Sequence, residues 1–220
     1  NHGLIGDIGC RVLQIACRDA LIWQRVYPSP VRLSVNKSVR QFRRDPECQA
    51  WFAILERHAF PLELLTIEIT EGLMLGDKSR LASLLQKFRN VSMKIVVDDF
   101  GTGYSSLTYL KRLPATLLKI DQSFVRDMLD DPDDLAIVQG VIGLATAFGH
   151  NVIAEGVETE AHGSRLLQLG CELAQGYGIS RPLPAQHIPQ WVADWQPPAS
   201  WAWPTAARLS LTAQGTPPLQ

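Results

Sequence analysis

Short apolar strands alternate with amphipathic helices along most of this 220-residue chain. The segments LLTIEIT (64–70) and KIVVDDF (94–100) have the composition of buried strands, and a helical pattern separates them. After an opening helix at 6–25, the strand–helix unit occurs six times, which favours an α/β fold with a parallel sheet and right-handed crossovers. The predicted strands are 31–36, 64–70, 94–100, 117–121, 151–157 and 173–180, and the predicted helices are 46–59, 77–89, 105–112, 133–149, 159–169 and 185–195.

Two architectures contain such units, a doubly wound open sheet and a (β/α)8 barrel. Polar side chains at the carboxyl ends of successive strands favour the barrel. Glu68 and Thr70 share one face of TIEIT, and Lys119 and Asp121 share one face of LLKID. Such residues converge at the mouth of a barrel, whereas an open sheet concentrates its site at one switch point. We therefore expect a (β/α)8-type barrel, of which the sequence shows six strands.

The composition excludes several classes of protein. The chain is 46% hydrophobic and 20% charged, as ordinary globular domains are, and its formal net charge is −1. This charge provides no basic field, so we expect no nucleic-acid partner. None of the four cysteines has the C-x-x-C spacing of a zinc site or a thioredoxin-like motif.

The expected globular domain covers residues 1–195. Residues 196–220 are rich in Pro, Ala and small polar residues without a sustained period, and we expect a flexible C-terminal tail there. No apolar segment approaches the ~20 residues that a membrane-spanning helix needs. We expect a cytoplasmic domain, with any tether to the inner membrane supplied by a region outside this chain.

Oxygen-bearing side chains dominate the predicted strand ends. Asp98 and Asp99 stand side by side where a buried strand ends, and such a pair needs a cation, backbone donors or a substrate unless it is a solvated turn. No His or Cys accompanies them, so the set suits one or two Mg²⁺ or Mn²⁺ ions rather than Zn²⁺. Asp121 is interpreted as the N-cap of the helical segment QSFV. The strand-end set is Asn36, Glu68, Asp98, Asp99, Lys119, Asp121, Glu155 and Gln175.

Six ordered motifs resemble the EAL family of bacterial cyclic di-GMP phosphodiesterases. They are VNKS (35–38), IEITE (67–71), DDFGTGYSSL (98–107), LKIDQSFV (118–125), AEGVET (154–159) and QGYGISRPLP (175–184). The resemblance extends from about Gly3 to Trp195. It implies a modified TIM barrel and metal-dependent hydrolysis of one phosphodiester bond of cyclic di-GMP, which yields linear pGpG. It also implies a homodimer and an upstream sensory or diguanylate-cyclase-like domain.

The resemblance assigns roles to individual residues. Lys119 matches the lysine that contacts the attacking water, and Glu155 matches a carboxylate at the metal site with a catalytic role. Glu71 matches the residue that anchors the DFGTGYSS loop, whose glycine hinges are Gly101 and Gly103. The implied metal ligands are Asn36, Glu68, Asp98, Asp99 and Glu155, and the implied substrate-binding residues are Glu158, Gln175, Arg181 and Pro182.

A catalytically inactive cyclic di-GMP receptor is the main alternative to an enzyme. The retained strand-end residues favour the enzyme, whereas the absence of the Glu-Ala-Leu tripeptide from the chain favours the receptor. An enolase-type barrel is a third alternative, but the chain has no room for its capping domain. Lys37 and Ile179 depart from the hydrophobic and aromatic residues common in the family, which affects substrate packing rather than the chemistry.

We expect the initial antiparallel strand and the Glu-Ala-Leu strand to lie upstream of Asn1, which accounts for the two strands that the sequence does not show. Residues 1–220 alone should then have little or no phosphodiesterase activity and should associate or aggregate through an open strand edge. The check is to assay this chain beside one extended upstream through Glu-Ala-Leu, at equal protein and Mg²⁺ concentrations. Equal rates would contradict the expectation.

Overall fold

A single parallel sheet organises the chain. The computed structural model describes residues 4–38, 41, 45–72, 78–103 and 115–201. Six strands follow one another in sequence order across the sheet, and each neighbouring pair is parallel. The predicted parallel α/β fold is therefore confirmed. The strands are β1 (Leu33–Asn36), β2 (Leu65–Thr70), β3 (Lys94–Phe100), β4 (Leu117–Ile120), β5 (Asn151–Ala154) and β6 (Leu173–Ala174).

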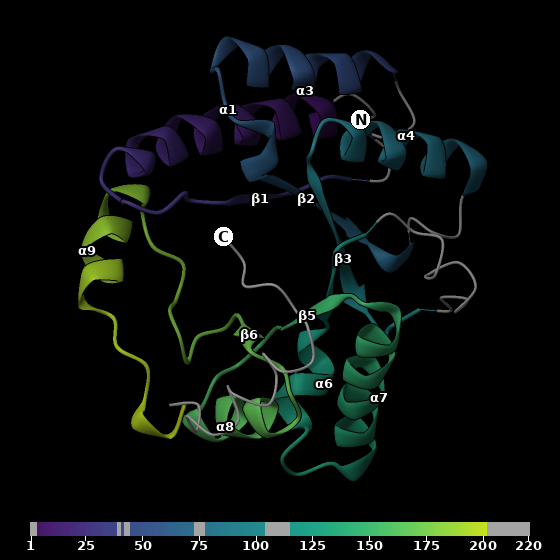
Figure 1. Cartoon of the computed structure of the whole chain (residues 1–220), viewed down its shortest axis with the longest axis vertical. Helices are drawn as coiled ribbons and strands as arrows, with labels where there is room; N and C mark the ends of the chain where they lie inside the picture. Colours follow the sequence, from purple (N-terminus) through teal and green to yellow (C-terminus); the bar gives the residue numbers. More distant parts are fainter. Residues whose placement is uncertain (1–3, 39–40, 42–44, 73–77, 104–114, 202–220) are drawn as a thin grey trace.

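The sheet follows an arc from β1 to β6, and the helices lie outside it (Figure 1). The predicted helix at 105–112 lies outside the described residues. No helix in the described ranges is both long enough and apolar enough to cross a membrane. The helices are α1 (Leu4–Gln24), α3 (Asp45–Arg57), α4 (Lys78–Asn90), α6 (Gln122–Asp127), α7 (Pro132–Phe148), α8 (Glu160–Gln168) and α9 (Ile188–Asp194), with 3-10 turns η1 (Leu62–Leu64), η3 (Ala185–His187) and η4 (Ala199–Trp201).

Local signals in the sequence set the ends of α7. Asp131 caps its N-terminus by accepting a hydrogen bond from the backbone N–H of Asp133, and Pro132 occupies the first turn. Gly149 ends the helix in the left-handed conformation, with φ 71°. Because α7 ends at this point, β5 begins two residues after Gly149, at Asn151.

Two predicted strands end three or more residues before the sequence pattern indicates. The strand expected at 151–157 ends at Ala154, because Gly156 adopts a positive φ of 73° and turns the chain. The strand expected at 173–180 contains only Leu173 and Ala174, because the chain then turns, with the N–H groups of Ile179 and Ser180 bonded to the carbonyl of Gly176. The functional loops therefore begin earlier than predicted.

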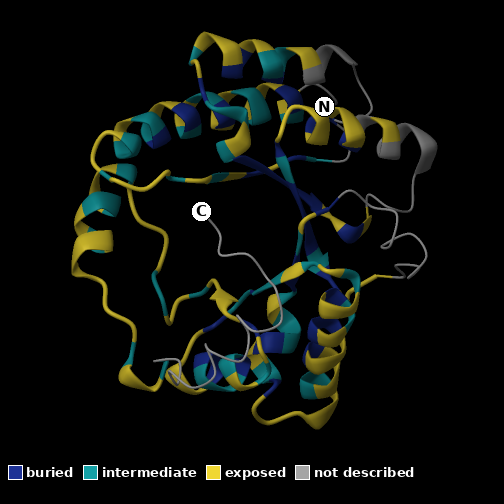
Figure 2. Ribbon diagram, viewed as in Figure 1, coloured by how far each residue is buried: buried dark blue, intermediate teal, exposed yellow. Residues whose placement is uncertain are grey.

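The hydrophobic core lies between the sheet and the helices, where buried residues concentrate in the strands and on the inward helix faces (Figure 2). Helix α1 departs from the simple amphipathic pattern. It buries Leu13, Cys17 and Ala20 against the core, whereas Ile8 and Val12 are 54% and 47% exposed. Ile8 and Val12 line a groove of about 570 Å³ that runs beside β1. The second apolar face of α1 thus lies next to a strand that, among the described residues, pairs only with β2.

The first part of the expected tail packs on α8. Residues 199–201 form η4, and the indole N–H of Trp201 donates a 2.9 Å hydrogen bond to the carbonyl oxygen of Glu160. A Cβ atom at Gly163 would clash with the indole ring, so the glycine leaves a slot on the helix for Trp201. This packing differs from the flexible state expected for residues 199–201, while residues 202–220 lie outside the described ranges.

We predict that Gly163→Ala destabilises the chain, whereas the same change at Gly143 does not. Gly143 also lies in a helix, but a Cβ there meets no atom within 4 Å. The added methyl at Gly143 should raise the free energy of unfolding by up to about 1 kcal/mol through helix propensity. At Gly163, overpacking against Trp201 should lower it by roughly 1–3 kcal/mol. Urea denaturation measures both values, and a stabilising Gly163→Ala would show that Trp201 does not occupy the slot.

Candidate metal centre

The carboxyl ends of four neighbouring strands bring a buried lysine and three carboxylates together. Lys119 on β4 places its Nζ atom 3.1 Å from Glu68 Oε2 of β2 and 2.9 Å from Asp98 Oδ1 of β3. Glu155, which directly follows β5, approaches the same nitrogen to 2.5 Å through Oε1. Because the parallel sheet aligns these strand ends, residues far apart in the sequence meet at one point. The structure thus brings together at one point the side chains that strand parity predicts at this end of the sheet.

The electrostatics of this cluster follow from burial. Burial alone would lower the pKa of Lys119, but hydrogen bonds to Glu155 and Asp98 and the charge of Glu68 raise it above its usual value. Burial raises the pKa of Glu155, Lys119 opposes that rise, and the charges of Asp98 and Glu68 add to it. The lysine is therefore a permanent cation at neutral pH, and the acids around it are crowded.

Asp99 has an unusual backbone conformation. Its φ is +54°, and the register between β3 and β4 shifts between Val97 and Phe100. The left-handed conformation is costly for most side chains but is tolerated by Asp and Asn. Burial raises the pKa of Asp99, and the charges of Asp98 and Asp121 and a hydrogen bond to Asp121 raise it further. The irregularity in β3 is what turns two consecutive acids toward the same site.

A metal ion fits this set of side chains. In the described part of the chain, Asp98, Asp99 and Glu155 each offer a carboxylate oxygen, and these oxygens lie within 4.8 Å of one another. An all-oxygen donor set that is partly buried suits a hard divalent cation. A cation would also relieve the repulsion that raises the pKa values of Asp99 and Glu155.

Glu71 anchors the loop that follows β3. Its buried Oε2 atom accepts hydrogen bonds from the backbone N–H groups of Gly101, at 3.0 Å, and Gly103, at 3.1 Å. A Cβ at Gly103 would lie 3.0 Å from the Glu71 carboxylate carbon, so the close approach suits glycine. The structure therefore gives Glu71 the contacts that the loop-anchoring prediction requires up to Gly103. Residues 104–106 of the same motif lie outside the described ranges.

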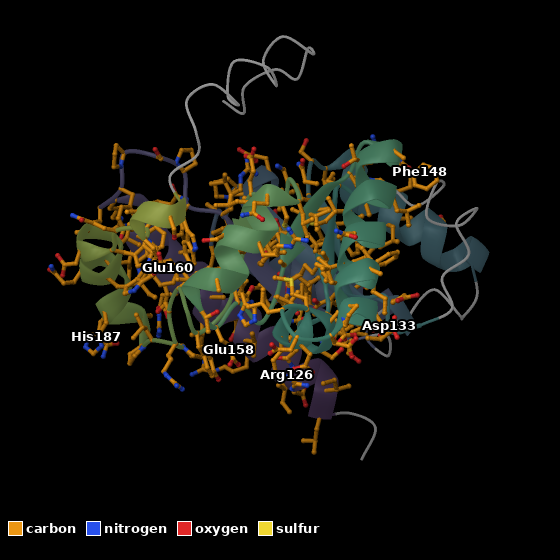
Figure 3. All side chains as sticks on the ribbon, turned by 90° about the horizontal axis from the view of Figure 1, so that it is seen from below. Arg126, Asp133, Phe148, Glu158, Glu160 and His187 are labelled. Carbon is orange, nitrogen blue, oxygen red and sulfur yellow. The ribbon has the colours of Figure 1, made fainter. Side chains whose placement is uncertain are left out.

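The remaining predicted residues lie on β1, before α8 and after β6. Asn36 ends β1 opposite Glu68 and lines the groove beside α1. Glu158 is exposed before α8, on the same end of the molecule as Arg126 (Figure 3). The exposed Arg181 stacks its guanidinium 4.5 Å from the ring centroid of Tyr177, and Pro182 follows it. Gln175 is exposed too, and its backbone bonds to the chain on either side of Glu155.

Sequence reasoning missed two contacts near the site. Asp121 caps α6 as predicted, with its carboxylate 2.8 Å from the N–H of Ser123, but it also lies near enough to Asp99 to help raise the pKa of that carboxyl. Its position on the same strand face as Lys119 was the available signal. His162 is buried in α8 and places Nε2 3.1 Å from the carbonyl oxygen of Arg126 in α6. No pattern in the sequence indicates that pairing.

Known proteins resemble this chain in sequence and in fold. The family model described as EAL domain matches residues 1–182. The chain is 39% identical over 186 residues to the bifunctional diguanylate cyclase/cyclic di-GMP phosphodiesterase MucR of Pseudomonas aeruginosa, covering 84% of this chain and 27% of MucR. It is 39% identical over 166 residues to the cyclic di-GMP phosphodiesterase PA2567 of the same species, covering 76% of this chain and 28% of that protein. The chain thus spans little more than a quarter of these curated relatives.

Solved structures confirm the predicted modified TIM-type barrel. The PaMucR phosphodiesterase, in a complex with c-di-GMP, matches with a TM-score of 0.81 and 39% identity, covering 84% of this chain and 75% of that one. The manganese/cyclic-di-GMP complex of Klebsiella pneumoniae BlrP1 matches with a TM-score of 0.71 and 26% identity, covering 82% of this chain and 45% of that one.

We predict that Lys119→Met lowers the free energy of unfolding at pH 7 by about 3–5 kcal/mol in the presence of a chelator, because it leaves buried carboxylates without their cation. Part of this loss should be recovered at pH 5. A carboxyl group whose pKa is raised in the folded state takes up protons there first, so stability is gained as the pH falls through that raised pKa.

Urea denaturation at the two pH values measures this effect. Lys87→Met, at an exposed position of α4, is the matched control and should change stability little. A Lys119→Met variant as stable as the wild type at pH 7 would contradict the role of Lys119 as the counter-charge of the cluster.

Proposed function

The chain belongs to the EAL domain family, and we propose that the intact domain, with its Glu-Ala-Leu strand, hydrolyses cyclic di-GMP to linear pGpG with a bound divalent metal. The observation that carries the proposal is the convergence of Glu68, Asp98 and Glu155 on Lys119 at the strand ends. The names of the relatives support it, because MucR and PA2567 are both described as phosphodiesterases of cyclic di-GMP.

The strand-end oxygens are the proposed metal ligands. Asn36, Glu68 and Asp98 would hold one ion, and Asp99 with Glu155 would hold a second. The short distances among the oxygens of Asp98, Asp99 and Glu155, within 4.8 Å, support a shared centre. Bound there, Mg²⁺ or Mn²⁺ would supply Lewis-acid chemistry, favouring deprotonation of a water and neutralising charge on the phosphate. BlrP1 is described in complexes with manganese and with calcium, which supports a divalent cation at such a site.

Lys119 positions and stabilises charge in the proposed reaction. A water oxygen forms a new bond to one phosphorus of the cyclic dinucleotide, and the bond from that phosphorus to a ribose 3′ oxygen breaks. Linear pGpG then carries a terminal phosphate, and the 3′ oxygen takes a proton. Lys119 is held protonated by its acidic neighbours, so it cannot act as the base. Its N–H groups orient the water and balance the negative charge that grows on the phosphate.

Residues around the site would hold the rest of the substrate. We assign Gln175, Glu158, Arg181 and Pro182 to substrate binding. The exposed Arg181–Tyr177 stack offers a planar surface of the kind that nucleobases bind. Gln175 is fixed through its backbone, with its N–H 2.8 Å from the carbonyl oxygen of Ala154. That bond keeps the Gln175 turn next to the strand that delivers Glu155.

The proposed setting is a larger signalling protein. The chain spans only 27% of MucR, which supports further domains beside this one, and an upstream sensory or diguanylate-cyclase-like domain is proposed. We also propose a homodimer, because the Gly101–Gly103 loop that the family resemblance links to dimerisation is anchored here by buried Glu71.

We predict that chelation abolishes hydrolysis of cyclic di-GMP and that Mg²⁺ or Mn²⁺ restores it. Glu68→Gln keeps the side-chain volume but removes a charge beside Lys119, and it should lower turnover by at least ~10²-fold. Glu56→Gln, at an exposed position of α3, is the control and should leave turnover unchanged. Product is measured by chromatography for residues 1–220 and for the version extended through Glu-Ala-Leu.

Two results would count against the proposal. Undiminished turnover in excess EDTA would remove the metal from the reaction. Tight binding of cyclic di-GMP by both versions, with no pGpG at any metal concentration, would identify the domain as a receptor instead.

A further inference from the structure

The acids of the metal centre stand next to two loops on either side of β4. Asp98 and Asp99 lie near the end of β3, which leads through Phe100 into Gly101, while Glu155 follows β5 and leads into Gly156. Between these loops, β4 ends and α6 (Gln122–Asp127) begins. Each loop glycine packs against a different residue in the first turn of α6.

The contact with the first loop is made by Phe124. Its ring lies so close to Gly101 that a Cβ built on the glycine would be 3.0 Å from the ring atom Cε2. Gly101 also has a φ of +105°, which side chains rarely adopt. Phe124 is only partly buried and packs against the hydrophobic core. The Phe124 ring therefore packs directly against the loop that follows Asp98 and Asp99.

The contact with the second loop is made by Gln122. A Cβ built on Gly156 would lie 2.7 Å from Gln122 Cβ and 3.1 Å from Gln122 Cα. These are main-chain and first side-chain atoms, which cannot rotate away as a side-chain tip could. The loop after Glu155 thus rests on the backbone of α6 itself.

Helix α6 is firmly held, so these contacts have a fixed base. Asp121 caps its N-terminus, and Val125 and Met128 are 0% and 1% exposed. His162 of α8 bonds to the carbonyl oxygen of Arg126 at 3.1 Å. The helix is fixed to the core on one side and to α8 on another.

We propose that the first turn of α6 is a spacer that sets the distance between the Asp98–Asp99 pair and Glu155, with Phe124 and Gln122 as positioning residues. Neither side chain touches the reacting atoms; each acts through the loop that it supports. The inference deepens the proposed function, because the two loops carry the proposed ligands of the second metal ion. Its structural part, the coupling of the loops through α6, is independent of catalysis.

The coupling makes a testable prediction. If a substitution in one loop displaces the first turn of α6, the other loop must move as well, because both loops pack against that turn. Ligand oxygens within 4.8 Å of one another tolerate little displacement, since metal centres depend on their supporting contacts for affinity. A change beside Glu155 should therefore be felt beside Asp99, although these residues belong to strands that are not neighbours.

The first experiment compares Gly156→Ala with Gly149→Ala. The two glycines have almost the same φ, +73° and +71°, but a Cβ at Gly149 meets no atom within 4 Å. Backbone strain is thus matched, and only Gly156→Ala pushes on α6. We expect Gly156→Ala to speed amide hydrogen exchange several-fold in the peptide containing residues 98–103, measured on metal-free chain, and Gly149→Ala to leave it unchanged. Equal effects of the two variants would overturn the proposal.

The second experiment compares Phe124→Ala with Val125→Ala. Both shorten an apolar side chain of α6, but Val125 is fully buried in the core, whereas Phe124 supports the loop. Phe124→Ala should speed exchange in both loops and lower the affinity for Mn²⁺, measured by calorimetry, by ~10-fold or more. Phe124→Leu should recover part of the loss. Val125→Ala should reduce global stability but keep the Mn²⁺ affinity within about threefold, well short of the loss seen on removing a supporting contact.

The outcomes separate this inference from the proposed function. If exchange in the loop after Glu155 does not respond to Phe124→Ala, the loops are not coupled through α6 and the inference is wrong, whatever the enzymatic activity. If the version extended through Glu-Ala-Leu binds no Mn²⁺ and hydrolyses no cyclic di-GMP, the proposed function fails, and the exchange data alone decide the inference.

Discussion

One buried ammonium group holds the centre of this molecule together. Lys119 Nζ contacts carboxylates from β2, β3 and the end of β5, and each of those contacts joins β4 to another strand of the sheet. Removing three acids from water is unfavourable, and a single lysine offsets only part of that cost. Burial first, and then the charges of Asp98 and Glu68, raise the pKa of Glu155 against the opposing effect of Lys119. A site with more negative than positive charge is prepared to accept a further cation.

Around this core, the support comes from backbone contacts rather than from a second ring of charges. Glu71 accepts bonds from two loop N–H groups, and α6 meets the two loops at Gly101 and Gly156. Glycine at these places allows helix and loop to approach more closely than any side chain would permit. The positions of the acids are thus set by packing, whereas their reactivity is set by charge.

The sequence predicted the parallel sheet, its order and the lysine–carboxylate cluster because these depend on periodicity. Alternation along a strand decides which face Glu68 and Lys119 occupy, and the carboxyl ends of parallel strands meet without further information. The α1 helix shows the limit. Its apolar positions were correctly read as helical, but Ile8 and Val12 face a groove rather than the core. Hydrophobicity indicates a face to be covered, not what covers it.

The contacts that join loops were not predictable in this way. Phe124 against Gly101, His162 against the carbonyl of Arg126, and Trp201 in the slot at Gly163 each join segments with no common period. Helix α6 is too short for periodicity to identify, and the N-cap residue Asp121 is the signal that indicates its start in the sequence. Strand parity therefore predicts where Lys119 and the strand-end acids gather, whereas most contacts that support their loops follow from tertiary packing.

The left-handed backbone at Asp99 restricts which mutations the lineage of this chain can accept. Asparagine would tolerate the φ of +54° but would lose the charge, and glutamate would keep the charge but resist the conformation. Glycine would fit the backbone and offer no oxygen at all. Position 99 thus requires both a residue that tolerates the left-handed backbone and a carboxylate, and aspartate alone provides both. A substitution by any of these three residues loses one of the two properties.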